Sequence, residues 1–161
     1  MRVLLTGGQG MLGSAIRNEI DRLRQDVDLR VITRAEVDLR DAAATRGVID
    51  EIEPDVIVHA AARVGGIAAN IADPTGFLLD NLLIDTSVLA AAIARRVPEL
   101  LYLGSSCMYP KDHRQPLVES DVLAAPLEPT NEGYALAKIS ASRLCQYASE
   151  QHELSCALED I

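Results

Sequence analysis

Three glycines spaced three residues apart separate the first apolar run of the chain from a segment with helical periodicity. The run is Arg2–Thr6, and Gly7, Gly10 and Gly13 follow it. Glycine tolerates the backbone angles of a tight turn and lets a ligand approach the main chain closely, and the next helix offers N–H donors to a phosphate. The spacing predicts a strand, a turn that binds a dinucleotide phosphate, and a helix.

Short strand-like runs alternate with longer helical segments along the rest of the chain, which is typical of βαβ units. The pattern predicts an α/β fold: one Rossmann-type domain over residues 1–161, with a doubly wound parallel sheet flanked by helices. A proline-rich stretch, 109–129, predicts an irregular loop, and Asn131 is expected to cap the helix that follows it. Strands are predicted at 2–6, 29–33, 55–59, 100–104 and 154–158, and helices near 12–23, 41–52, 74–94 and 131–148.

Composition excludes several classes of protein. With 161 residues, 48% of them hydrophobic, the chain can bury a core, and its net charge of -9 argues against nucleic-acid binding. No stretch is uninterruptedly apolar over the length of a bilayer, so we expect a cytoplasmic protein with no membrane partner. Neither the cysteines nor the histidines have the spacing of a metal site, so we expect free thiols and no metal. These residues are Cys107, Cys145, Cys156, His59, His113 and His152.

The end of the second predicted strand bears on cofactor choice. An acidic residue there would bind the ribose 2′-hydroxyl of NAD, whereas this chain has Arg34, 21 positions after Gly13. A guanidinium can pair with a 2′-phosphate, which favours NADP; the alternative is a solvated surface arginine. Asp38 and Leu39 follow and are expected to border the adenine.

A tyrosine and a lysine lie one helical turn apart at Tyr134 and Lys138. Such a pair suits proton transfer to a carbonyl, because a nearby ammonium favours the phenolate, although in an arbitrary protein it is most often structural. Ser105 and Cys107 follow the fourth predicted strand, at the edge where open α/β sheets bind ligands. Cys107 is either a thiolate base or a small buried residue.

Several longer motifs resemble one family, the extended short-chain dehydrogenase/reductases. They are TGGQGMLGSAI, AARVGGIAAN, DNLLI, LGSSCMYPK and LEPTNEGYALAKI, and they extend over nearly the whole chain. Within that family they resemble the enzymes that convert GDP-4-keto-6-deoxy-mannose to GDP-L-fucose, by epimerisation at C3 and C5 and NADPH-dependent reduction at C4.

The resemblance implies roles for individual residues. Ser105 and Tyr134 would polarise the C4 carbonyl, Lys138 would assist Tyr134, and Cys107 would be the epimerisation base. Substrate contacts would come from Val64, Gly65 and Asn81. The implied NADP(H) site comprises Gly7, Gly10, Met11, Leu12, Gly13, Arg34, Asp38, Leu39, Ala60, Ala61 and Lys138.

Two departures from the family pattern qualify these expectations. Gln9 stands where the family often has a basic residue, which weakens the preference for NADP. The family also continues past this chain with a general-acid histidine and a small domain that grips the GDP-sugar, so we expect the N-terminal half of the family fold without its substrate domain. A non-catalytic NADP(H)-binding module, a half-enzyme completed by a second polypeptide, and another nucleotide-sugar epimerase or dehydratase remain alternatives. We also expect a homodimer or self-association through an uncovered apolar sheet edge.

Overall fold

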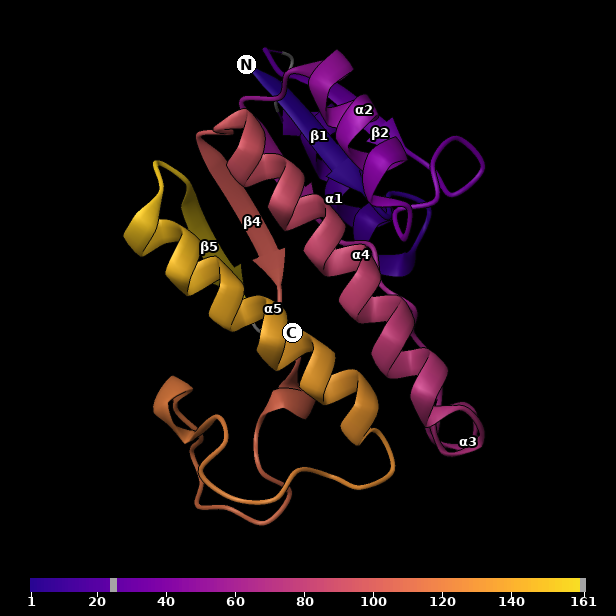
Figure 1. Ribbon diagram of the computed structural model, residues 1–161, viewed down its shortest axis with the longest axis vertical. Coiled ribbons are helices and arrows are strands. Elements are labelled where there is room, and N and C mark those ends of the chain that lie inside the picture. Colours follow the sequence, from indigo (N-terminus) through magenta and orange to yellow (C-terminus); the bar gives the residue numbers. More distant parts are fainter. Residues whose placement is uncertain (24–25, 160–161) are drawn as a thin grey trace.

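A five-stranded parallel sheet organises the chain in the computed structural model, which describes residues 1–23 and 26–159 (Figure 1). The strand order is β2-β1-β3-β4-β5. The chain therefore runs outward from β1 to β2, then crosses back to β3 and continues in the opposite direction. Its strands are β1 (Arg2–Thr6), β2 (Asp28–Ile32), β3 (Val56–His59), β4 (Glu99–Leu103) and β5 (Ser155–Glu159).

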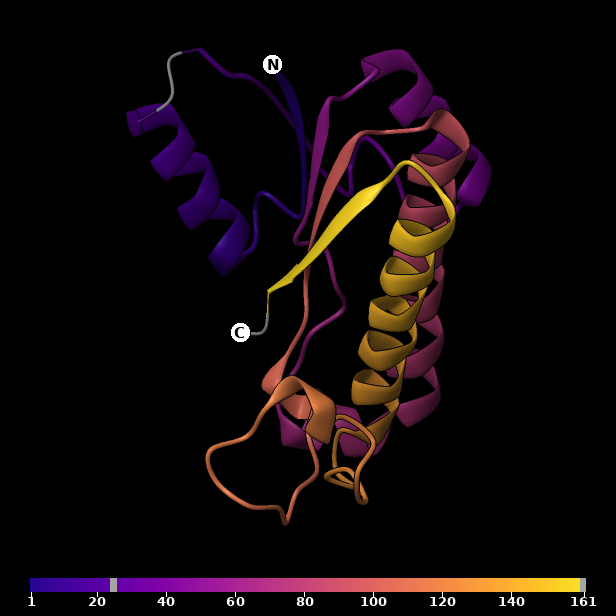
Figure 2. The same cartoon turned by 90° about the vertical axis from the view of Figure 1, so that its left-hand side faces the viewer.

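Helices cover both faces of the sheet, but unevenly (Figure 2). Helix α1 (Met11–Leu23) lies on one side, and α2 (Ala42–Ile52), α4 (Pro74–Arg95) and α5 (Glu132–Gln151) lie on the other. This is a doubly wound fold, as predicted. The direction of winding reverses between β1 and β3, and ligands bind beyond the strand ends at such a reversal in open α/β sheets.

The larger core lies between the sheet and the three helices on its second face. Ile57 and Leu100 from the strands meet Ile49 of α2, Leu89 of α4 and Ala141 of α5, all of them 2% exposed or less. A smaller cluster on the opposite face joins Val3, Leu5 and Val58 to α1. Packing of α4 against both neighbours therefore fixes where the side chains of α4 and α5 meet.

The predicted elements agree with the structure to within three residues, the largest difference being the end of α5 at Gln151, and two further features differ. A short helix, α3 (Ile67–Ala72), was not predicted, because six residues are too few for a helical period to be recognised. Asn131 does occupy the N-cap position of α5, but its side chain makes no capping hydrogen bond and donates instead to Cys107. The loop before it contains only two single-turn 3₁₀ helices, Ser106–Met108 and Glu119–Asp121.

Helix α4 is long and apolar enough, by length and composition, to cross a membrane, although its apolar run is interrupted by polar residues. In this fold 44% of its 18-residue apolar window is buried. Asn81 and Asp85 are fully buried on it and both form hydrogen bonds within the domain. These contacts make α4 a core helix here, which accounts for its composition.

Two helical glycines give a matched test of this packing. A Cβ at Gly47 in α2 would meet nothing within 4 Å, so Gly47→Ala is expected to raise the free energy of unfolding by about 0.5–1 kcal/mol through helix propensity. A Cβ at Gly133 would lie 2.7 Å from the carbonyl oxygen of Pro74, so Gly133→Ala is expected to lower it by about 1–3 kcal/mol. Urea denaturation followed by circular dichroism measures both. Equal effects of the two substitutions would contradict the packing of α5 against the start of α4.

Candidate functional site

A cavity of about 710 Å³ opens beyond the carboxyl ends of β1 and β3, where the direction of winding reverses. The turn after β1 forms one wall, and the segment 60–64 after β3 forms the other. Tyr134 and Lys138 of α5 close it at one end, and Arg34 and Asp38 line the opposite end. The cavity therefore joins residues that the sequence places in four separate motifs.

Close contact between main chains shapes the turn. Gly7 has a φ of 69°, and a Cβ on it would lie 2.6 Å from the backbone of Ala60. A Cβ on Gly13 would lie 2.2 Å from the carbonyl oxygen of Gly7. The Gly10 N–H donates to that same oxygen at 2.9 Å. Only glycine fits at Gly7 and Gly13, and the first turn of α1, starting at Met11 and Leu12, offers its N–H groups beside the cavity.

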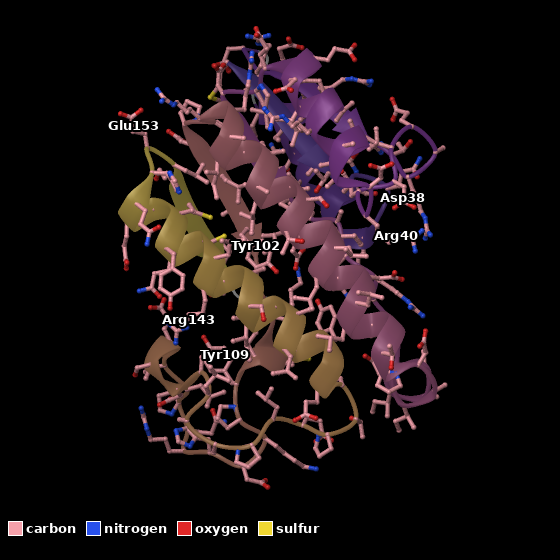
Figure 3. All side chains as sticks on the ribbon, in the orientation of Figure 1. Asp38, Arg40, Tyr102, Tyr109, Arg143 and Glu153 are labelled. Carbon is pink, nitrogen blue, oxygen red and sulfur yellow. The ribbon has the colours of Figure 1, made fainter. Side chains whose placement is uncertain are left out.

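Two arginines lie at the end of the cavity that follows β2. Arg40 is held by both oxygens of Asp38, the shortest contact being 2.6 Å, and by Asp80 at 3.1 Å. The Arg40 hydrogen bonds lower the pKa of the Asp38 carboxyl to about 2. Among the ion pairs of the described residues Arg34 takes part in none, and it faces Asp38 only at longer range. Arg34 is therefore the arginine available to an anion in this part of the cavity. Figure 3 shows Asp38 and Arg40 together at the periphery of the molecule.

An ion-pair chain that the sequence analysis missed fixes the outer wall. Asp80 bonds Arg40 through one oxygen and Arg63 through the other, both at 3.1 Å. Arg63 also bonds Asp73 at 2.8 Å and lies over the ring of Phe77, 4.5 Å from its centroid. These partners are up to 40 positions apart in sequence, so no local pattern signals them.

The three expected substrate residues lie in different environments. Val64 lines the cavity and is 72% exposed. Gly65 is exposed and is not part of the cavity lining, and a Cβ on it would meet the ring of Phe77 at 2.8 Å. Asn81 is fully buried, and its amide binds the backbone of Arg63 at both N–H and C=O, at 2.8 and 3.0 Å. The observed contacts of Asn81 shape the segment before Val64 rather than face the cavity.

Tyr134 and Lys138 project from one face of α5 into the cavity, and Ser105 contacts Tyr134 from the end of β4. Burial raises the pKa of the Tyr134 phenol, and the negative charge available at Cys107 adds to this, whereas the hydrogen bond with Ser105 lowers it. Burial lowers the pKa of Lys138, and Asp85 opposes that shift. Tyr134 therefore has a hydroxyl partner in Ser105, and Lys138 lines the same cavity one helical turn away on α5.

Cys107 lies beside this group, half-buried, with the Asn131 amide donating to its Sγ at 2.9 Å. Neither Cys107 nor Ser105 is part of the cavity lining itself; both lie just past the end of β4. Cys145 is buried and Cys156 partly buried, and all three thiols are free. Within residues 1–23 and 26–159 no group of His, Cys, Asp or Glu side chains could hold a metal ion.

Comparison with known proteins gives a consistent result. Residues 3–158 match the model of the NAD dependent epimerase/dehydratase family. The chain is 44% identical over 151 residues to the GDP-L-fucose synthase of Escherichia coli K12, covering 94% of this chain and 47% of that protein. It is 41% identical to the GDP-L-colitose synthase of Yersinia pseudotuberculosis, covering 94% and 48%. The chain thus spans about half the length of the curated relatives it matches.

A solved structure with the same fold is the GDP-D-glycero-L-gluco-heptose synthase of Campylobacter jejuni, determined in the presence of NADPH. It superposes with a TM-score of 0.93 at 26% sequence identity, over 99% of this chain and 46% of that one. The whole of the present chain therefore corresponds to one half of that structure.

The contact between Ser105 and Tyr134 can be tested by titrating the phenol. Ser105→Ala removes a hydrogen bond that favours the phenolate, so the already raised pKa of Tyr134 is expected to rise further. Absorbance at 295 nm against pH measures the ionisation, and the difference from Tyr134→Phe isolates this tyrosine from the others. An unchanged or lower pKa in Ser105→Ala would show that the hydroxyl does not act on the phenol.

Proposed function

The chain belongs to the NAD dependent epimerase/dehydratase family, and we propose that it binds NADP(H) and carries the reductive residues of an epimerase-reductase acting on a GDP-linked 4-keto sugar. The observation that carries the proposal is that Tyr134 and Lys138 line the cavity that the glycine turn borders, with Ser105 hydrogen-bonded to Tyr134 just past the end of β4. A cofactor site and proton-transfer groups in one cavity are the combination that carbonyl reduction requires.

The cavity fits a dinucleotide by its main-chain geometry. Side chains are excluded where Gly7 and Gly13 approach neighbouring backbone, so a pyrophosphate can reach the N–H groups at the start of α1. Arg34 would hold the 2′-phosphate, with Asp38 and Leu39 beside the adenine and Ala60 and Ala61 along the opposite wall. The bound nicotinamide would supply the hydride.

For the reduction, the Tyr134 hydroxyl would donate its proton to the C4 oxygen of the sugar while the Ser105 hydroxyl donates a hydrogen bond to that oxygen. Lys138 would hold the nicotinamide ribose and favour the phenolate left on Tyr134, because its positive charge lies on the same face of α5. Ser105 and Tyr134 would thus both donate to the C4 oxygen, where the negative charge develops during reduction.

The same ketone would serve the epimerisation. Cys107, as the thiolate, would remove a proton from a carbon next to C4, and the electron pair of the broken C–H bond would move toward the carbonyl oxygen to form an enolate. Ser105 and Tyr134 would stabilise that enolate oxygen, and Asn131 holds the sulfur in place. Protonation from the opposite face of the sugar needs an acid, and none of the described residues is placed there by the observed contacts.

Relatives named GDP-L-fucose synthase and GDP-L-colitose synthase favour GDP-4-keto-6-deoxy-mannose as the substrate over sugars linked to other nucleotides. Val64, Gly65 and Asn81 would then border the sugar, Asn81 through the segment it anchors. Because the chain spans about half of these relatives, the second candidate is an NADP(H)-binding module that turns over no substrate unless another polypeptide completes the site.

Self-association is proposed through β5, whose strand pattern is mostly exposed. A hollow of about 530 Å³ lies beside it, lined in part by Met108, Val122 and Leu158. We also propose that the protein is soluble and located in the cytoplasm, in keeping with the metabolic enzymes among its relatives.

Cofactor choice can be tested on the purified chain. Arg34→Ala is expected to weaken NADPH binding about tenfold or more and to change NADH binding little, because only NADPH carries the 2′-phosphate. Arg46→Ala, which removes an exposed arginine paired with Asp50 on α2, is the matched control and should change neither. Nicotinamide fluorescence measures binding, and light scattering on the same samples reports self-association. Equal losses for the two cofactors would refute the assignment of Arg34.

Reduction can be tested with NADPH and GDP-4-keto-6-deoxy-mannose by following the loss of absorbance at 340 nm. Substrate-dependent loss is expected, falling at least about a hundredfold in Tyr134→Phe because the proton donor is removed. If a folded chain binds NADPH yet turns over no substrate, the NADP(H)-binding module is the correct description. If it binds neither cofactor, both candidate functions fail.

A further inference from the structure

Lys138 has an environment that the family motifs do not describe. Its side chain is 3% exposed, and its ammonium lies 3.8 Å from the Oδ2 atom of Asp85 and 4.4 Å above the ring of Tyr102. Figure 3 shows Tyr102 deep in the molecule, between α4 and α5. A lysine that lines a cofactor cavity thus has its counter-charge on the side away from the cavity, inside the core.

Asp85 is held on both oxygens. The Tyr102 hydroxyl donates to its Oδ2 at 2.7 Å, and the His59 Nε2 lies 3.0 Å from its Oδ1. Asp85, Tyr102 and His59 have no exposed surface and come from α4, β4 and β3. Three elements therefore converge on one carboxylate, which has no freedom to leave Lys138.

The hydrogen bonds of His59 extend the network to the cavity wall. The Thr6 hydroxyl oxygen accepts the Ala61 N–H at 3.2 Å and lies 2.7 Å from the His59 Nδ1. In the tautomer whose Nδ1 accepts from Thr6, the Nε2 carries the ring hydrogen and donates it to Asp85. One continuous set of bonds runs from the cavity wall at Ala61 through the core to Asp85, adjacent to Lys138.

We propose that Asp85 is a positioning residue for Lys138: its buried carboxylate, fixed by Tyr102 and His59, keeps the Lys138 ammonium charged and holds it at the cavity. What the charged ammonium then does for Tyr134 and the nicotinamide ribose rests on the proposed function. The state of Lys138 itself follows from the geometry alone.

The groups facing Lys138 support a charged amine. Burial lowers the pKa of Lys138 and so favours the neutral amine, whereas the Asp85 carboxylate on α4 raises that pKa. Cys145 and Tyr134 face the network from α5, and His59 and Tyr102 face it from the sheet through Asp85. Of these groups, Asp85 is the one whose ordinary state at neutral pH is an anion. Removing its charge should therefore leave the amine without compensation.

The chain permits a direct test because it has two lysines, Lys111 and Lys138. Only the neutral amine reacts with acetic anhydride, so the rate of acetylation at each lysine, measured against pH by peptide mass spectrometry, reports when that amine loses its proton. Lys138 lines the cavity with 3% of its side chain exposed, so its acetylation is expected to be slow and the pH midpoint, not the absolute rate, is compared. Lys111, exposed and paired with Glu128, is the internal control.

Asp85→Asn is expected to move the midpoint for Lys138 down by about one pH unit or more, a tenfold increase in rate at a fixed pH below that midpoint, and to leave Lys111 unchanged. Asparagine can still accept from His59 and face the Tyr102 hydroxyl, so the network keeps its shape. Asp50→Asn removes one exposed carboxylate from α2 and should move neither lysine. An unchanged Lys138 midpoint in folded Asp85→Asn would overturn the proposal.

If Asp85→Asn does not fold, the Lys138→Met and Asp85→Asn/Lys138→Met variants keep the proposal testable. Without the lysine there is no ammonium to compensate, so the double variant should recover folding. If Asp85→Asn and the double variant both fail to fold, Asp85 serves the fold and not Lys138, and the proposal is overturned. NADPH binding and turnover by the unaltered chain are measured separately, so a failure of the proposed function is distinguished from a failure of this inference.

Discussion

The approach of three backbone segments at the end of β1 is the constraint on which the rest of the site depends. Gly7, Gly13 and Ala60 come so close that a Cβ at either glycine would overlap main-chain atoms. This contact sets the angle at which α1 leaves the sheet and the distance between the turn and the segment after β3. The direction of winding reverses at the same point, so the connections after β1 and β3 leave the sheet in opposite directions and a crevice remains between them. The cavity therefore depends on the sheet topology and on glycine at positions 7 and 13.

The chemistry at the other end of the cavity depends on a different contact, the packing of α5 against α4. That contact brings Lys138 to Asp85, and α5 also brings Tyr134 to Ser105 at the end of β4. The small residues Ala137 and Ala141, both buried on α5, permit the close approach. The glycine-turn end of the cavity is thus fixed by the main chain, whereas the end with Tyr134 and Lys138, the proposed proton-transfer groups, is fixed by how two helices pack.

This division explains which features could be predicted from the sequence. The glycine turn, the strands and the Tyr134 to Lys138 spacing are local patterns, and each was found at the expected place. Asp85 and His59 carry no such signal: each is a polar residue within an apolar segment, and their partners lie in other elements. Asn131 illustrates the same limit. Its local pattern indicates a helix cap, but its side-chain amide donates a hydrogen bond to the thiol of Cys107, 24 positions away. Tertiary contacts of this kind decide which hydrogen-bond partner a polar side chain has, and the local sequence does not distinguish between the possible partners.

The buried Lys138 and Asp85 pair also bears on why such a core is kept. Taking two charges out of water costs several kcal/mol per ion, and an apolar pair of similar volume is often as stable or more so. Stability is therefore a weak reason to keep an ammonium at the surface of a core that α2, α4 and α5 already fill with apolar side chains. Here the pair is built so that the lysine faces the cavity while the carboxylate, with both oxygens bonded, faces inward. In this orientation a ligand in the cavity meets the positive charge of Lys138 and does not reach the negative charge of Asp85. The pair therefore serves the site and not the fold.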